Sequence, residues 1–332
     1  MVFKTMIKKL AQLHLKRLRY DSGLFAAAAQ PRTGYTKSWI RDNVYEAIGF
    51  EHDSDDIRKT YHALFDLLIK HESHIDKALA KRPQEENGYI HARCCPHTLE
   101  IFNEPWGNKQ NDAIGAFLFK VAQYEHRGIS VIRDYHDLTI LKKLVAYLAS
   151  IEYWHDPDNG MWEENQEVHA SSVGACVAGL QNIKTLVPVP PQLIDSGMET
   201  LNNLLPAESE TKKIDLALLS LIYPYNVVTP AQREIILDNV ETFLVRKRGV
   251  LRYKHDQYYN NGKEAEWVFG FPWLAKIYKD LGNKEKHQHY LMRTLRCMNW
   301  KGELPELYFG GSVNHNANTP LGWAQAMLVE AI

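Results

Sequence analysis

The chain has 332 residues, of which 45% are hydrophobic and 24% charged, and its formal net charge at pH 7 is −1. This length permits a large buried core, and the composition is that of a soluble globular protein. A chain so nearly neutral lacks the charge that draws proteins to nucleic acids or anionic membranes, so neither is expected as a partner.

The first twenty residues, 1–20, alternate Lys and Arg with Leu at helical spacing. They lack the continuous apolar core of a signal peptide and the length of a membrane span. An ordinary first helix is expected, the alternative being a membrane-surface or targeting helix, and we therefore expect a cytoplasmic protein. The four cysteines include the adjacent pair Cys94 and Cys95 and have no Cys-x-x-Cys spacing. They indicate neither a disulfide framework nor a zinc site.

Hydrophobic residues recur at helical spacing along most of the chain, and strand-like alternation is scarce. The pattern predicts helices over 3–20, 38–50, 54–79, 111–126, 136–152, 167–185, 191–205, 213–222, 229–245, 265–281, 283–298 and 319–331. Thr229 is expected as the N-cap of one helix, with Gln232 completing a capping box. Gly282 is expected to end one helix just before the next begins. A single hairpin is expected, over 89–102.

The connections between these helices alternate in length. Short ones lie at 51–53, 187–189 and Gly282, and long ones at 21–37, 80–110, 153–166, 246–264 and 299–318. Antiparallel helix hairpins stacked in a ring would place every long loop at one end and every short loop at the other. The pattern predicts an all-α six-hairpin toroid, a single domain over 1–332, with one loop-rich mouth. The alternative is two helical bundles joined near 185–190.

The third long loop carries the most distinctive residues, Trp162, Glu163 and Glu164. An aromatic face can stack on a pyranose ring, and a carboxylic acid can protonate a glycosidic oxygen. Such chemistry needs a second carboxylate from elsewhere in the chain. The alternative for this stretch is a solvated helix start, where glutamates are favoured by the helix dipole.

Every other long loop also leads to residues suited to a sugar site. They are Trp39, Arg41 and Asp42 after 21–37, Trp106, Gln110 and Asp112 in or just after 80–110, Arg252 in 246–264, and Glu306, Tyr308 and Trp323 in or after 299–318. Fixed donors and acceptors such as Arg41 and Asp42 can clamp sugar hydroxyls. Taken singly, each of these residues is equally consistent with a cap or a surface position.

As an ordered set these motifs resemble glycoside hydrolase family 15, which contains the glucoamylases. The set consists of Trp39-Ile40-Arg41-Asp42, Trp106-Gly107 with Gln110 and Asp112, Trp162-Glu163-Glu164, and Pro305-Glu306 followed by Trp323. The runs 41–45, 170–174 and 304–308 look closer still to the glucoamylase-like domain of the phosphorylase kinase α and β subunits. The resemblance extends from about Tyr20 to the C-terminus and implies an (α/α)6 barrel.

The resemblance also implies roles for particular residues. Glu163 matches the general acid, Glu306 the general base, and Glu164 a neighbour that helps bind substrate. Arg41 and Asp42 match the clamp on the terminal glucose, Trp106 an aromatic of the pocket, and Arg252, in 246–264, an arginine of the family's fifth loop. The Asn108-Lys109 pair departs from the family's Arg-Pro, which affects contacts beyond the first sugar.

These assignments imply an inverting, exo-acting hydrolase that releases glucose from non-reducing ends of a soluble α-glucan or oligosaccharide. An inverting pair needs one protonated and one ionised carboxyl group, about 6.5–9.5 Å apart. No cofactor or metal is expected, and we expect neither a β-sandwich nor a starch-binding module. The alternative is a catalytically silent glucan-sensing or regulatory domain, like the phosphorylase kinase subunits. The linkage cleaved stays open among α-1,4, α-1,6 and α,α-1,1.

Overall fold

The structure is a computed structural model that describes residues 2–102, 104 and 106–332. Its α-helices are α1 (Val2–Leu18), α2 (Ile40–Ile48), α3 (Ser54–Lys70), α4 (Glu72–Ala80), α5 (Asn111–His126), α6 (Tyr135–Ile151), α7 (Ala170–Ile183), α8 (Pro191–Leu204), α9 (Pro230–Asn239), α10 (Gly270–Asp280), α11 (Lys284–Leu295) and α12 (Gly322–Ala331). Within the described residues, none of these helices is both long and apolar enough to cross a membrane.

The remaining elements are short. The 3-10 helices are η1 (Pro31–Thr33), η2 (Glu86–Gly88) and η3 (Leu216–Leu221), and η4 (Val240–Leu244) is a π-helix. Strand β1 (Ser38–Trp39) pairs antiparallel with β2 (Arg93–Cys94), and β3 (Glu266–Trp267) with β4 (Leu307–Tyr308). In register, Trp39 faces Arg93 and Trp267 faces Leu307.

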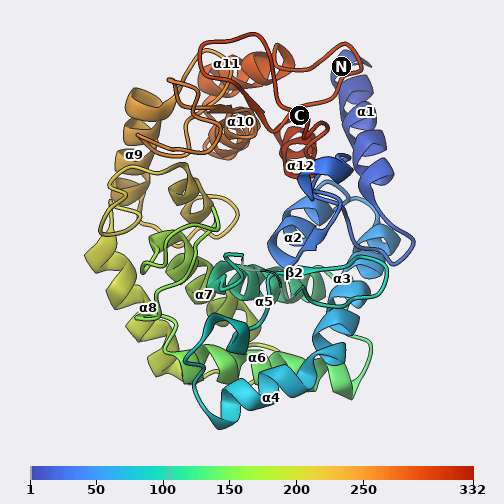
Figure 1. Cartoon of the computed structure of the whole chain (residues 1–332), viewed down its shortest axis with the longest axis vertical. Helices are drawn as coiled ribbons and strands as arrows, with labels where there is room; N and C mark the ends of the chain where they lie inside the picture. The colour runs from blue at the N-terminus through green and yellow to red at the C-terminus, as the bar shows by residue number, and fades with distance from the viewer. Residues whose placement is uncertain (1, 103, 105) are drawn as a thin grey trace.

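The helices form two concentric rings. The inner ring runs α2, α5, α7, η3, α10 and α12, each packed on the next, and α12 returns to pack on α2. The outer ring is formed by α1, α3 with α4, α6, α8, α9 and α11, and Figure 1 shows these helices around the periphery. The predicted toroid of alternating outer and inner helices, the (α/α)6 barrel, is thus confirmed.

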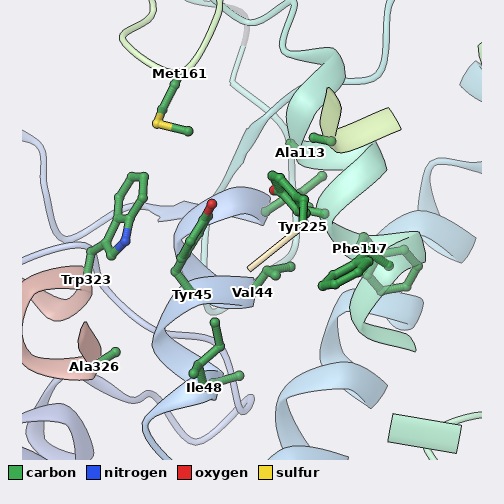
Figure 2. Packing of buried hydrophobic residues seen from close by; sticks show 14 of the residues in the cluster. Val44, Tyr45, Ile48, Ala113, Phe117, Met161, Tyr225, Trp323 and Ala326 are labelled. Atoms are coloured by element: carbon green, nitrogen blue, oxygen red, sulfur yellow. The ribbon is translucent and has the colours of Figure 1, made fainter. Parts of the chain in front are cut away.

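The inner helices are buried nearly all round, as a helix enclosed on every side must be. All nine residues of α2 are buried, and α5, α7 and α12 are almost as deeply enclosed. Figure 2 shows Tyr45 of α2 standing between Trp323 of α12 and Tyr225, with Phe117 of α5 beyond. Tyr45 and Trp323 stack with ring centroids 4.3 Å apart. Aromatic side chains therefore fill the centre of the barrel.

Glycines allow two inner helices to approach closely. A Cβ atom added at Gly115 of α5 would lie 2.4 Å from the backbone of Ala175 in α7. One added at Gly179 of α7 would lie 2.5 Å from the carbonyl oxygen of Gly115. Since real Cβ atoms do not come so near to backbone, any larger residue would push α5 and α7 apart.

Several helix ends follow their sequence signals. Thr229 and Gln232 form the predicted capping box at the start of α9. Gly282 has φ of 71° and ends α10, and the side chain of Asn283 caps α11 by accepting from the amide of Lys286. Asp53 and Asp134 cap α3 and α6 in the same way. These side chains satisfy amides that a helix leaves free at its start.

Four predicted elements differ in the structure. The helix predicted over 54–79 divides at His71, whose ring contacts the carbonyl of Leu99 at 2.7 Å. The helix predicted over 213–222 is the 3-10 helix η3, and that predicted over 229–245 ends as the π-helix η4. In the predicted 89–102 hairpin, only Cys94 bridges to Ile101, because β2 pairs instead with β1.

Candidate active site

A cavity of about 360 Å³ lies where the long loops meet at the start of the inner helices. It is lined by Ala27, Tyr35, Trp39, Arg41, Asp42, Trp106, Gly107, Met161, Trp162, Glu163, Glu164, Arg252, Tyr258, Trp267, Phe269, Glu306, Leu321 and Trp323. Loops far apart in the sequence thus converge on one pocket, as a ring of helix hairpins requires.

Glu306 is buried and held by three donors. Tyr35 Oη and Asn318 Nδ2 each donate to its carboxylate at 2.7 Å, and Asn316 Nδ2 donates to the same oxygen as Asn318. Burial raises the pKa of Glu306, and these hydrogen bonds and the charge of Arg252 oppose that rise. The carboxyl group is therefore fixed in position and can take up a proton.

Glu163 sits in a strained turn, with φ of 61°. Its carboxylate accepts from Trp106 Nε1 at 2.5 Å, Gln110 Nε2 at 3.0 Å and Arg41 Nη2 at 3.3 Å. A Cβ atom on Gly107 would lie 2.8 Å from the carbonyl oxygen of Glu163, so the two loops touch through their backbones. A non-glycine residue with positive φ costs conformational energy, and such strain clusters at functional sites.

Arg41 and Asp42 begin the inner helix α2 at the base of the pocket. Arg41 Nη1 donates to Gln110 Oε1 at 2.7 Å and contacts Asp112 at 3.4 Å. Burial raises the pKa of Asp42 to about 7, against the lowering effect of Arg41, and the nearby carboxyl groups of Glu163 and Asp112 add to the rise. Gln110 and Asp112 thus hold Arg41, while Arg41 and Asp42 line the cavity.

Glu164 belongs to a charged network on the next wall. It accepts from Arg252 Nη2 and Tyr253 Oη at 2.7 Å each and from Lys212 Nζ at 2.8 Å. Arg252 also forms two hydrogen bonds to Asp256, at 2.6 and 2.7 Å. Burial alone would raise the pKa of Glu164, but the charges of Arg252 and Lys212 and these hydrogen bonds lower it. Glu164 is consequently held as an anion.

Aromatic rings form the rest of the pocket wall. The ring of Trp162 lies 6.0 Å from those of Trp267 and Phe269, centroid to centroid, and Phe269 stacks on Trp323 at 5.0 Å. The indole of Trp162 donates to Asp215 at 2.8 Å, which fixes its orientation. Such a wall presents flat apolar faces of the kind that pack against sugar rings.

The structure brings most of the predicted site residues to this cavity. Trp39, Arg41, Asp42, Trp106, Trp162, Glu163, Glu164, Arg252, Glu306 and Trp323 line it, and Gln110 and Asp112 contact Arg41 from behind. Tyr308 is directed elsewhere: its hydroxyl donates to the carbonyl of Cys297 at 3.1 Å, and its ring packs against His315. Its pairing within β3–β4 accounts for this placement.

Other residues of the site were not predicted: Tyr35, Trp267, Phe269, Asn316 and Asn318. The asparagines carry a signal, because Asn314, Asn316 and Asn318 occupy every second position. The amide of Glu306 donates to the carbonyl of Asn318, and that of Asn316 to the carbonyl of Leu307. This hairpin turns the asparagine side chains toward Glu306.

The arrangement suits acid–base chemistry on a sugar. Two carboxyl groups from different loops share a cavity whose other walls are aromatic, with Arg41, Asp42, Glu164 and Arg252 as polar anchors. Within residues 2–102, 104 and 106–332, no group of three or more His, Cys, Asp or Glu side chains could hold a metal ion.

Curated relatives of the chain are regulatory subunits of a kinase. It is 26% identical over 265 residues to the probable phosphorylase b kinase regulatory subunit alpha of Caenorhabditis elegans, covering 67% of this chain and 21% of that protein. It is 25% identical over 338 residues to the skeletal muscle isoform of that subunit from Oryctolagus cuniculus, covering 82% and 27%. The chain spans about a quarter of the length of these relatives.

Solved structures with the same fold are glycosidases. A wild-type glycosidase superposes with a TM-score of 0.85 at 19% identity, covering 99% of this chain and 96% of that chain. A glycosidase variant in complex with glucose superposes with a TM-score of 0.84 and the same coverage, at 19% identity. The glucoamylase of Saccharomycopsis fibuligera gives 0.69 at 14% identity, covering 99% and 94%.

The model of one protein family matches residues 4–189, which is more than half of the chain and includes Arg41, Asp42 and Glu163. Together with the barrel and its pocket, this match identifies the chain as a member of the glycosyl hydrolases family 15.

Proposed function

We propose that the protein is an inverting, exo-acting glycoside hydrolase that releases glucose from the non-reducing ends of a soluble α-glucan or α-linked oligosaccharide. Residues 1–332 would form its single catalytic domain. The observation that carries the proposal is that Glu163 and Glu306, from loops more than a hundred residues apart, line the same aromatic pocket. Membership of family 15 and the match to a glycosidase in complex with glucose support the same reading.

In this mechanism Glu163 is the general acid and Glu306 the general base. Glu163 gives its proton to the glycosidic oxygen as the bond from that oxygen to the anomeric carbon breaks. A water molecule attacks the same carbon from the opposite face and gives its proton to Glu306. The configuration is thereby inverted, and the two carboxyl groups are expected about 6.5–9.5 Å apart to leave room for the water.

Neighbouring residues would prepare the two carboxyl groups. Trp106 and Gln110 donate hydrogen bonds to Glu163 and would orient its carboxyl group toward the leaving oxygen. Hydrogen bonds from Tyr35, Asn316 and Asn318 would orient the carboxyl group of Glu306 toward the attacking water. Hydrogen bonds from fixed donors cost no reorganisation during the reaction, which is how a preorganised site lowers a barrier.

Substrate recognition would rest on the base of the pocket. Arg41, anchored by Gln110, offers guanidinium donors, and Asp42 offers a carboxylate to the hydroxyls of a terminal glucose. The buried aromatic centre of the barrel beneath them, seen in Figure 2, leaves no route for a chain to run through. These features favour attack on chain ends.

The test is to assay glucose release, and the anomer released, from oligosaccharides with α-1,4, α-1,6 and α,α-1,1 linkages. We expect β-glucose from at least one of them. Glu163→Gln and Glu306→Gln should each lower turnover by about 10²–10⁴-fold, the usual contribution of general acid–base catalysis, while sugar binding persists. Glu285→Gln, on the exposed face of α11, is the matched control. Release of the terminal glucose as the α-anomer from an α-1,4- or α-1,6-linked oligosaccharide, or full turnover by either pocket variant, would contradict the mechanism, whereas an α,α-1,1 disaccharide should give one β-glucose and one α-glucose.

The second candidate is a catalytically silent glucan-binding regulatory domain. The names of the curated relatives favour it, since they are regulatory subunits of phosphorylase b kinase. Calorimetric titration of the wild-type protein with the same oligosaccharides measures binding, and the glucose assay measures turnover. Together they distinguish a hydrolase from a regulatory domain. Binding without turnover on any linkage would replace the hydrolase with the regulatory reading.

A further inference from the structure

The loop that carries Glu163 and Glu164 is closed at its base. The backbones of Asp158 and Glu167 pair through two hydrogen bonds, of 2.9 and 3.0 Å. Within the loop, Asn159 Nδ2 donates to the carbonyl of Glu164 at 2.7 Å. Whatever fixes this base also fixes the direction of the two glutamates.

His169 lies directly beneath the base and immediately precedes α7. It is only 3% exposed, and its ring contacts Gly160, where an added Cβ atom would lie 2.7 Å from Cδ2 of the imidazole. Gly160 has φ of 62°, a conformation that suits glycine. The turn of the loop therefore rests on the face of this ring.

Two buried carboxyl groups flank His169. Its Nδ1 lies 3.4 Å from Glu208 Oε1, and Glu208 is itself held by the hydroxyl of Ser171 at 2.5 Å and the amide of Ser171 at 3.1 Å. Asp158, whose charge also acts on His169, accepts from the amide of Asn111 at 2.8 Å and that of Gly160 at 3.2 Å. His169 thus connects the loop to the starts of α5 and α7.

We propose that His169 is a positioning residue for the candidate general acid: its buried ring, packed against Gly160 and paired with Glu208, holds the base of the loop so that Glu163 and Glu164 point into the pocket. The catalytic consequence rests on the proposed function, but the order of the loop does not. A neutral side chain of similar size would lose the attraction to the two carboxylates and release the turn above it.

Charge on His169 strengthens this hold over a defined pH range. Burial and the charge of Lys212 lower the pKa of His169. The hydrogen bond to Glu208 and the charges of Asp158 and Glu208 raise it by more, so that the pKa of His169 is about 9. The group facing Asp158 from α5 is Asp112, and burial raises the pKa of Asp158 to about 7. A raised pKa makes the stabilising contribution complete below pH 6.5 and lost as pH rises through about 9. Because the pKa of Asp158 is about 7, this carboxyl group is already ionised at the pH where His169 loses its proton.

The experiment compares His169→Asn with His155→Asn, an exposed histidine just before the same loop. Hydrogen exchange at pH 7, followed by mass spectrometry, should show about tenfold or greater loss of protection in 158–167 and none in α11. Turnover should fall about ten- to hundredfold, mainly in kcat, because a small misplacement of a catalytic group is costly. The difference in melting temperature between wild type and His169→Asn should narrow from pH 7 to pH 10.

Each alternative outcome is decisive. Wild-type protection of 158–167 in His169→Asn would overturn the proposal. If that variant loses protection throughout, Glu208→Gln takes its place, and an unchanged loop there would overturn the proposal equally. A melting difference that stays constant with pH would remove the role of charge. If the wild-type protein turns over no glycoside, the proposed function fails. Hydrogen exchange of 158–167 still tests whether His169 holds the loop, so the two failures can be told apart.

Discussion

Tyr35 is the residue through which the candidate base can be tuned. Its hydroxyl donates to Glu306 at 2.7 Å and lies 3.0 Å from that of Tyr258, and the bond to Glu306 lowers the pKa of that carboxyl group. Tyr35→Phe removes the donor, so the pKa of Glu306 should rise further. Because a general base must be ionised, the acid limb of the kcat/KM profile should move to higher pH.

Turnover of Tyr35→Phe at optimal pH should also fall, by about tenfold or more, as expected for losing one hydrogen bond to a charged group. The control is Tyr135→Phe, whose ring is 73% exposed on α6. An acid limb in the wild-type position would mean that Tyr35 does not govern the ionisation of Glu306.

At the residue scale, sequence motifs located the carboxylates and the residues that bind Glu163, namely Trp106, Gln110 and Arg41, but not the partners of Glu306. Glu163 stands next to Trp162 and Glu164, and this local pattern can be recognised. Tyr35 lies far from Glu306 in the sequence, and Asn318 lies across a hairpin turn from it. Only the folded chain brings these two side chains to the carboxyl group of Glu306. Contacts made through tertiary structure leave little local pattern.

At the scale of elements, the approach of α5 to α7 depends on Gly115 and Gly179. Gly115→Ala would force its Cβ atom into the backbone of Ala175. Overpacking of this kind costs about 1–3 kcal/mol. Urea unfolding should show that loss for Gly115→Ala, whereas Glu199→Ala, on the exposed face of α8, should change stability by less than about 0.5 kcal/mol. Equal stability of the two variants would show that the helices can separate freely.

Helices with clear end signals were predicted best, and α9 after Thr229 and α11 after Gly282 begin within one residue of their predicted starts. The segment 213–222 was wrong in type because Leu216–Leu221 is buried on every side, so its composition carries no period. Pro224, which lacks an amide hydrogen, also limits any continuation. His71 divides α3 from α4 through a contact with Leu99 that no local pattern indicates.

At the scale of the whole molecule, buried ionisable groups set the pH of greatest stability. Burial raises the pKa of Asp42, Asp158 and Asp215 to about 7, so their stabilising contribution is lost as pH rises from about 4 to 7. That of His169 is lost between pH 6.5 and about 9. Hydrogen bonds lower the pKa of Asp53, Glu72 and Asp134, whose contribution disappears in acid. We expect the melting temperature to be highest near pH 5, and calorimetry at pH 3, 5 and 9 would check this.

A melting temperature still higher at pH 9 than at pH 5 would contradict that expectation, because it would mean that the buried carboxyl groups are not destabilised by ionisation. At this scale the alternation of long and short connections favoured the barrel over two helical bundles, and the family resemblance implied the same fold. Loop lengths could favour the barrel because chain connectivity in a ring of hairpins dictates which end each loop must reach.

The inner ring closes where α12 packs on α2, and there the amide of Gly322 donates to the carbonyl of Ala27 at 2.8 Å while Ala28 bridges to Leu321. During synthesis α2 leaves the ribosome long before α12 exists, so the helices that enclose it stay incomplete for most of translation. Contacts of such large sequence separation are slow to form and leave hydrophobic surface exposed meanwhile. Nascent chains of this barrel should therefore depend on chaperones until α12 has emerged.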